Sequence, residues 1–244
     1  SSRERAPRLL LVAALAAAAL AAGARPADAA SIDDLRINQI QVVGSHNSYK
    51  EKPRPEVSSA LQALAPDLAA EIEYGHLPLG EQLDHGVRQF ELDVLADPDG
   101  GLYSTPAGLE ILGIEEPVDP VMTEPGFKVQ HIQDIDFEST CPTFTQCLTD
   151  IEEWSSDNPE HLPVMVMVET KSDSIAEGAE GLGFELPDLG VEFADPPDMT
   201  AELFDDLESE ILSVFDQDHL ITPDDVRGDA ESLESAVLET GWPT

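Results

Sequence analysis

The sequence contains few basic residues. It has 12 lysines and arginines against 50 aspartates and glutamates in 244 residues, which gives a formal net charge of −38. Proteins bind nucleic acids through basic surfaces, so this balance argues against a nucleic-acid partner. It also argues against adhesion to anionic membranes by general electrostatics. We expect most of the carboxylates to form a solubilising acidic surface and a few to bind a cation.

Cysteine is also scarce. The two cysteines, Cys141 and Cys147, lie in the segment Cys-Pro-Thr-Phe-Thr-Gln-Cys. Two thiols alone do not make a zinc site, and in a secreted chain the spacing predicts a local disulfide. The sequence also lacks G-x-S-x-G, a Walker loop, a dinucleotide fingerprint and H-E-x-x-H, which disfavours the corresponding enzyme classes.

Long hydrophobic runs are missing except at the N-terminus. There, three arginines precede an apolar run over residues 9–22, and small residues follow with an Ala-Asp-Ala cleavage pattern at 27–29. The run is shorter than the roughly 20 apolar residues that a membrane span needs, so a signal peptide is favoured over an anchor. We expect residues 1–29 to be a Sec-type signal peptide and the product to be secreted.

The stretch from Gln39 to Lys50 combines a strand pattern with reactive side chains. A short apolar segment leads directly into the polar turn His46-Asn47-Ser48-Tyr49. Enzymes with an α/β fold place their chemistry in such loops at strand ends. Lys50, Lys52 and Arg54 follow this turn, and they form either a positive spot for an anionic substrate or a solvated loop.

The remaining chain alternates between strand and helix patterns. Such alternation predicts a parallel α/β fold, and the near-continuous apolar run at 163–169 predicts a strand buried on both faces. Residues 105–126 show weak periodicity and are expected to form a long loop, and 102–104 a short return strand. The predicted strands are 87–94, 128–131 and 163–169, and the predicted helices are 56–75 (broken near Pro66), 78–85, 143–155, 200–215 and 232–240.

Three carboxylates fall near the ends of two of these strands. Because side chains alternate along a strand, Glu91 and Asp93 share one face, and Glu169 and Lys171 share one face of another strand. Inward carboxylates are costly unless they are paired or bind a cation. With the amide oxygen of Asn47 they form a hard-oxygen set that suits Ca²⁺ better than zinc. Taken singly, each carboxylate is equally well explained as a surface charge.

Of the six histidines, only His46 and His131 lie where a predicted strand runs into a polar loop. Two histidines beside a cation can act as a general acid and a general base. The other four lie in predicted helices or turns and are interpreted as surface or capping residues: His76, His85, His161 and His219.

Four motifs in this order carry a family resemblance. Residues 44–49, residues 86–93, the lone His131 and residues 163–169 resemble the N-terminal catalytic half of phosphatidylinositol-specific phospholipase C, in particular the secreted, calcium-dependent bacterial branch. The resemblance implies a partial TIM-type (β/α) barrel with about the first half of the strands. Residues 30–244 would then be a catalytic domain that is truncated at its C-terminus.

The resemblance also implies roles for individual residues. His46 assists attack by the inositol 2-hydroxyl, and His131 protonates the departing diacylglycerol oxygen. Lys171 and Arg88 are candidate substrate contacts, and the Ca²⁺ ligands are Asn47, Glu91, Asp93 and Glu169. The expected products are diacylglycerol and an inositol phosphate. We expect a monomer that contacts the membrane surface transiently to reach phosphatidylinositol.

Two other functions fit part of the pattern. A glycerophosphodiester phosphodiesterase shares the barrel, two histidines and a carboxylate-bound cation, but it usually opens on His-Arg-Gly where this sequence has His-Asn-Ser. A non-catalytic, secreted, acidic calcium-binding protein would explain the carboxylates, but it would not need two histidines at strand ends.

Overall fold

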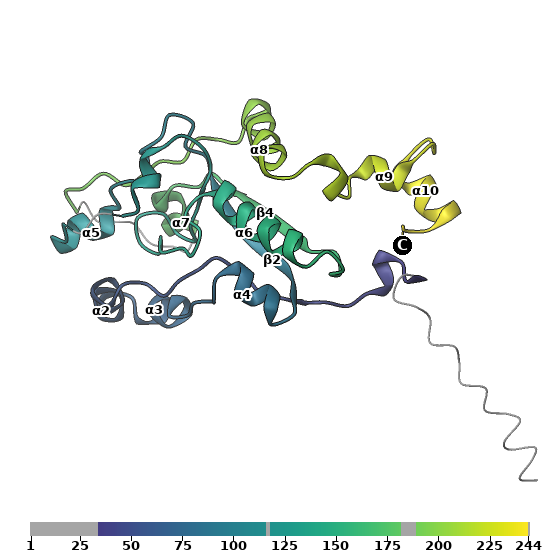
Figure 1. The fold of residues 1–244 in the computed structure, drawn as a ribbon. Helices are drawn as coiled ribbons and strands as arrows, with labels where there is room; N and C mark the ends of the chain where they lie inside the picture. The colour runs from purple at the N-terminus through teal and green to yellow at the C-terminus, as the bar shows by residue number, and fades with distance from the viewer. Residues whose placement is uncertain (1–33, 116–117, 182–188, 244) are drawn as a thin grey trace, which may run out of the picture. The chain divides into compact units, whose positions relative to one another are not determined.

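The computed structural model describes residues 34–115, 118–181 and 189–243 (Figure 1). The chain divides into two units, one formed by residues 42–221 and the other by the segments that precede and follow it. The predicted signal peptide lies outside the described residues. In the ranges described, no helix combines the length and the apolar character that a transmembrane span requires.

The sheet of the larger unit is built around one strand, β2 (Val87–Leu95). On one side β2 pairs in parallel with β4 (Met165–Lys171), with Gln89 opposite Met165 and Leu95 opposite Lys171. On the other side it pairs in parallel with the short β1 (Val43–Gly44). The predicted α/β class is therefore confirmed, with an open sheet at its centre.

The third strand departs from the parallel pattern. β3 (Lys128–Val129) runs antiparallel to the end of β2, with Val129 opposite Val94. After the segment that contains α5 (Ala107–Leu112) and η3 (Pro120–Thr123), the chain returns to the end of β2, where the amide of Gly126 donates to the carbonyl of Asp97 at 2.9 Å. The ammonium of Lys128 is buried and lies 3.2 Å from Oδ2 of Asp97, which holds the returning segment beside the strand end.

The two faces of β2 have different environments. The side chains of Phe90, Leu92 and Val94 are fully buried in the main core. Their burial against helices removes apolar area from water, which stabilises the unit. The opposite parity carries Glu91 and Asp93, as alternation along the strand predicts. The covering helices are α4 (Leu79–Asp84), α6 (Phe144–Asp157), which lies along the sheet in Figure 1, and α8 (Ala201–Val214).

The prediction that the 163–169 strand is buried on both faces is wrong. Most of β4 is only half-buried, and Met167 is 47% exposed. Among the described residues β4 pairs with β2 alone, so its other edge and part of one face have no neighbour. An apolar run shows that a strand can be buried on both faces, but the elements packed against it determine how much of it is buried.

Most predicted helices are present with small shifts in their ends. The 56–75 segment is divided into α2 (Pro55–Leu64) and α3 (Pro66–Ile72), because proline cannot continue a helix and is favoured at its first position. α6 begins with a capping box between Thr143 and Gln146. Short helices were missed in the predicted loop and after the last predicted strand, since one or two turns leave little periodicity: α5 (Ala107–Leu112), η3 (Pro120–Thr123) and α7 (Ile175–Gly181).

The expected return strand at 102–104 is a turn. The backbone amide of Leu102 donates to the carboxylate of Asp97, which already binds Lys128. The Asp97 carboxylate thus accepts the hydrogen bond that the amide of Leu102 would donate to a neighbouring strand. The segment therefore forms a turn at the end of β2 and does not pair with it.

The smaller unit joins the two ends of the described chain. It contains η2 (Ile37–Gln39), α9 (Pro223–Arg227) and α10 (Leu233–Thr240). The guanidinium of Arg36 donates to the carbonyl of Thr240 at 2.8 Å and to that of Trp242, and the amide of Ile37 donates to the carbonyl of Pro243 at 2.9 Å. These bonds hold the segment before the sheet against the segment after α8.

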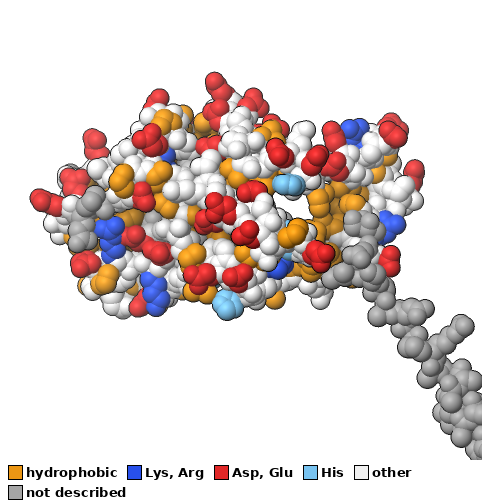
Figure 2. Space-filling model, in the orientation of Figure 1, with side chains coloured by type: hydrophobic (Ala, Val, Ile, Leu, Met, Phe, Trp, Pro, Cys, Tyr) orange, Lys and Arg blue, Asp and Glu red, His pale blue; other side chains and the backbone are white. Residues whose placement is uncertain are grey.

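Acidic side chains are spread over the face shown in Figure 2 and are not gathered into one patch. This distribution fits the expectation that most of the carboxylates solubilise the surface. The carboxylates with a specific function must therefore be identified by burial and by their neighbours, not by their sign.

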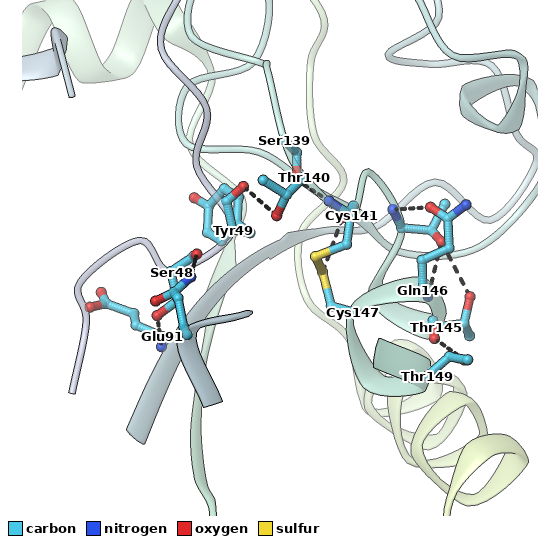
Figure 3. The surroundings of a disulfide bond; sticks show 12 residues. Ser48, Tyr49, Glu91, Ser139, Thr140, Cys141, Thr145, Gln146, Cys147 and Thr149 are labelled. Atoms are coloured by element: carbon cyan, nitrogen blue, oxygen red, sulfur yellow. Dashed lines mark hydrogen bonds between the residues drawn. A yellow bond between two sulfur atoms is a disulfide. The ribbon is translucent and has the colours of Figure 1, made fainter. Parts of the chain in front are cut away.

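The predicted disulfide between Cys141 and Cys147 is confirmed, and both residues are buried (Figure 3). The hydroxyl and the backbone amide of Thr140, beside the bond, both donate to the carbonyl of Tyr49, at 3.1 and 2.8 Å. The small disulfide loop therefore holds the segment that follows the His46 turn.

Removing this disulfide is expected to destabilise the larger unit. For a loop this short, the loss of the constraint on the unfolded chain predicts about 2 kcal/mol for Cys141→Ala/Cys147→Ala. Urea unfolding of the oxidised protein and of the double variant measures the difference. Equal midpoints would contradict a stabilising role for the bond, and reduced wild-type protein should match the variant.

Candidate active site

The turn after β1 is fixed against β2. The amide of Ser48 donates to the carbonyl of Glu91 at 3.0 Å, and the amide of Glu91 donates to Oγ of Ser48 at 2.9 Å (Figure 3). Asn47 has a φ of 48°, a left-handed conformation that asparagine tolerates better than most residues. The imidazole of His46 is 73% exposed, and its Nε2 lies 3.8 Å from Oε1 of Glu91.

Three carboxylates meet beside this turn. Glu91 and Asp93 come from β2, and Glu169 comes from β4, where it is paired in register with Asp93. One oxygen from each lies within 4.8 Å of the others. Glu91 and Asp93 are buried, so their mutual repulsion is poorly screened and calls for a positive charge.

Lys171 supplies part of that charge. Its ammonium lies 2.7 Å from Oδ2 of Asp93 and 3.9 Å from Oε1 of Glu169, and it donates to the carbonyl of His131 at 2.9 Å. One lysine does not balance three carboxylates. Oδ1 of Asp93 is buried and forms no hydrogen bond of normal geometry within the described part of the chain, although the hydroxyl of Tyr49 lies near this carboxylate. A carboxylate oxygen without such a bond, in a cluster of hard oxygen donors, fits a divalent cation such as Ca²⁺.

His131 is held by a buried carboxylate. Its Nδ1–H donates to Oδ2 of Asp136 at 2.7 Å, and Asp136 is fully buried. This hydrogen bond fixes the ring and its tautomer, so Nε2 is the nitrogen that can exchange a proton with a substrate. The sequence prediction missed Asp136.

Lys50, the first of the three basic residues after the His46 turn, lies neither in a positive surface spot nor in a solvated loop. Lys50 is fully buried, with its ammonium 3.2 Å from Oδ1 of Asp136 and bonded to the carbonyls of Ile72 and Tyr74 at 2.7 and 2.9 Å. Arg54 forms an ion pair with Glu138. Burial lowers the pKa of Lys50, and the charge of Asp136 opposes that effect. Lys50 therefore serves as a buried counter-ion, and the interpretation of these residues as an anion-binding spot or a solvated loop is wrong for it.

Two tyrosines line the same region. Burial raises the pKa of Tyr49, and the charge of Asp93 raises it further. Burial also raises the pKa of Tyr74, whose hydroxyl accepts a hydrogen bond from Nδ2 of Asn47 at 2.7 Å. Both phenols stay protonated near neutral pH, so neither acts as a base, and the hydroxyl of Tyr74 serves as a hydrogen-bonding group.

His76 lies in this region as well. Its Nε2 is 2.9 Å from the carbonyl of His46, and its ring meets that of Tyr74 edge-on at 5.7 Å. Its interpretation as a simple surface or capping residue missed this contact, because nothing in the local sequence shows that residues 74–76 lie beside the 46–47 turn.

Arg88 is not brought to the carboxylate cluster. It lies near the start of β2, about 16 Å along the strand from Asp93 at roughly 3.3 Å per residue. Its guanidinium packs on the ring of Trp154 at 4.5 Å and donates to the carbonyls of Leu83 and Val87. These contacts join the end of α4 and the start of β2 to α6. They give Arg88 a structural role that requires no substrate.

Apart from Asn47, whose side chain bonds to Tyr74, the other predicted residues are joined by direct contacts. His46 lies beside Glu91, while Lys171 links Asp93 to the backbone of His131.

A sequence model of the family described as "Phosphoinositide phospholipase C, Ca2+-dependent" matches residues 35–244. The chain belongs to this family. The resemblance drawn from the four sequence motifs is thereby confirmed.

Solved structures of one protein are also similar. They are crystal structures of the calcium-dependent phosphoinositol-specific phospholipase C from the Gram-negative bacterium Pseudomonas sp., in an apo form with a myoinositol complex and in two further apo crystal forms. Identity is 18%, the TM-scores are 0.46 to 0.47, and 87% of this chain aligns with 54% of theirs. The chain thus spans about half the length of these structures. No curated protein matches it.

The family is a family of calcium-dependent phosphodiesterases. Its cation requirement agrees with the donor set found here, which consists of carboxylate oxygens and offers neither thiolates nor imidazoles.

Proposed function

We propose that this chain carries the acid/base pair and the calcium ligands of a phospholipase C that cleaves the glycerol–phosphate bond of phosphatidylinositol. The products would be diacylglycerol and an inositol phosphate. The observation that supports the proposal is the link of both predicted histidines to one carboxylate cluster. The ring of His46 lies beside Glu91, and the backbone carbonyl of His131 accepts from Lys171, which also binds Asp93.

The calcium ligands in this proposal are Asn47, Glu91, Asp93 and Glu169. Three of them offer oxygens within 4.8 Å of one another, and the assignment is supported by Oδ1 of Asp93, which forms no hydrogen bond of normal geometry among the described residues. Bound Ca²⁺ would lower the pKa of the attacking hydroxyl and neutralise charge on the phosphate.

The two histidines would divide the proton transfers. His46 has an exposed ring and would take the proton from the inositol 2-hydroxyl. His131 would give a proton to the diacylglycerol oxygen from Nε2, because its Nδ1 is bonded to Asp136. Lys171 already bridges Asp93 and His131, and its ammonium would contact the anionic phosphate once a cation neutralises Asp93.

The proposal includes the setting in which the enzyme acts. Residues 1–29 would direct secretion and residues 30–244 would belong to the catalytic domain, working as a monomer. The buried disulfide supports an oxidising, extracellular compartment. Contact with the membrane would be transient, because the net charge of −38 disfavours lasting adhesion to anionic lipid.

Calcium removal tests the proposal directly. The full chain as it is naturally expressed is given phosphatidylinositol vesicles, and diacylglycerol release is measured with Ca²⁺ and after chelation. We expect turnover with Ca²⁺ and none with chelator. Activity that survives chelation would contradict the calcium assignment. Cleavage of glycerophosphodiesters in place of phosphatidylinositol would replace the proposed substrate class, and calcium binding without turnover on either substrate would leave only a binding protein.

A further inference from the structure

Among the residues that the structure describes, the side-chain amide of Asn47 forms a hydrogen bond at one end only. Asn47 is 2% exposed, and its Nδ2 donates to the hydroxyl of Tyr74 at 2.7 Å. Within residues 34–115, 118–181 and 189–243 no hydrogen bond is made to its Oδ1. An asparagine amide has a donor end and an acceptor end, so the partner of one end determines which atom the other end presents.

This amide lies beside the carboxylate cluster. The next residue, Ser48, is bonded in both directions to Glu91, one of the three clustered carboxylates. The phenol of Tyr74 experiences the negative charge of Asp136 first and then those of Asp93 and Glu91, two members of the cluster. Asn47 thus directly precedes the residue that anchors this turn to Glu91, and among the described residues its Oδ1 accepts no hydrogen bond.

Tyr74 is itself held in position. The buried ammonium of Lys50 donates to its carbonyl at 2.9 Å and lies 4.6 Å from the centre of its ring. The edge-on contact with His76, and the bond between His76 and the carbonyl of His46, join residues 74–76 to residues 46–47 at a second point. The phenol oxygen is thus a fixed acceptor.

We propose that Tyr74 is a positioning residue for the calcium ligand Asn47: by accepting from Nδ2 it turns Oδ1 toward the carboxylates. The inference rests on the proposed function, because it takes Asn47 as a calcium ligand. Its physical basis is the competition for the amide. The carboxylates attract the N–H₂ end of Asn47, which would present donors where a cation needs an oxygen. The hydroxyl of Tyr74 engages that end and holds the opposite orientation.

Removal of one oxygen atom tests this role. Tyr74→Phe keeps the ring and removes the acceptor, while Tyr103→Phe is the matched control. Tyr103 is buried where Tyr74 is half-buried, and its hydroxyl donates to the carbonyl of Ala96 and not to Asn47. Ca²⁺ alone is titrated into each folded protein by calorimetry, without substrate. We expect about tenfold weaker binding for Tyr74→Phe, as for other partners of metal ligands, and unchanged binding for Tyr103→Phe.

A double-mutant cycle separates positioning from general damage. Asn47→Ala should weaken Ca²⁺ binding, and adding Tyr74→Phe to it should cause no further loss, because the amide to be oriented is gone. Unchanged affinity in Tyr74→Phe, or fully additive losses in the double variant, would overturn the inference alone. Unchanged affinity in Asn47→Ala would overturn the proposed ligand set and the inference with it. Urea midpoints of all four proteins confirm that folded states are compared.

Discussion

Replacing His131 with alanine is expected to lower kcat/KM for phosphatidylinositol by about 10³-fold, in the range found for the loss of a general acid. The diacylglycerol alkoxide is a poor leaving group, and without His131 it must depart unprotonated or take its proton from water. The ring is held by Asp136 with Nε2 available, so few other groups can replace it. Initial rates of diacylglycerol release from vesicles at saturating Ca²⁺ measure the effect.

A substrate with a better leaving group distinguishes this role from a structural one. A nitrophenyl ester of inositol phosphate releases a nitrophenolate, which departs without a proton. His131→Ala should therefore recover most of its activity on this ester. His46→Ala should be defective on both substrates, because both require the same attack by the inositol 2-hydroxyl. Equal losses on the two substrates in His131→Ala would contradict the assignment of His131 as the acid.

The carboxylate cluster could be predicted from the sequence because it depends on local rules. Alternation along a strand places Glu91 and Asp93 on the face opposite Phe90 and Leu92, whatever else the chain does. Glu169 joins them because two apolar strands separated by helices pair in parallel, and their carboxyl ends then meet. The four motifs were also sufficient to predict the family, and the match over residues 35–244 confirms that prediction.

The groups that support the site could not be predicted in this way. Asp134 and Asp136 both follow His131 closely, and the sequence gives no reason to choose between them. In the structure Asp134 accepts from the amides of Ala107 and Ala194, far away in the chain, while Asp136 binds His131. Lys50 looked like a surface charge because its partners, Asp136 and the carbonyls near residue 72, are set by tertiary contacts.

Arg88 and β3 show the same limit. Their sequence motifs identify a strand, but not its direction or what packs on its first residues. β3 is antiparallel because the segment between 96 and 127 returns to the end of β2 at Asp97, and the guanidinium of Arg88 packs on Trp154. A strand pattern therefore predicts which face a residue occupies more reliably than it predicts the partner of that residue.

Replacing Asp93 with asparagine is expected to weaken Ca²⁺ binding by about 100-fold or more and to abolish calcium-dependent turnover at physiological Ca²⁺. Asp93 is the most buried of the three carboxylates, at 1% exposure, and it pairs with Glu169 across the strands. The loss of its charge removes a hard ligand and also leaves the ammonium of Lys171, 2.7 Å from Oδ2, beside the site without its main partner. Both changes disfavour a divalent cation.

Asp97 supplies a matched control from the end of the same strand. It is 2% exposed and lies 3.2 Å from a buried lysine, Lys128, but it does not belong to the carboxylate cluster. Asp97→Asn should cost about 3 kcal/mol of folding stability, because a buried ammonium loses its partner, and should leave Ca²⁺ affinity unchanged. A protein with roughly 5–15 kcal/mol of stability remains folded after that loss.

Urea unfolding with and without Ca²⁺ reads both effects in one experiment. A cation that binds only the folded state adds about 2.7 kcal/mol at a concentration of 100 Kd. Wild-type protein and Asp97→Asn should both show this calcium-dependent shift, Asp97→Asn from a lower starting point, whereas Asp93→Asn should not show it at the same concentration. A full calcium-dependent shift in Asp93→Asn would mean that Ca²⁺ binds elsewhere. If Asp93 is a ligand, its loss weakens binding to the folded state and must reduce the shift.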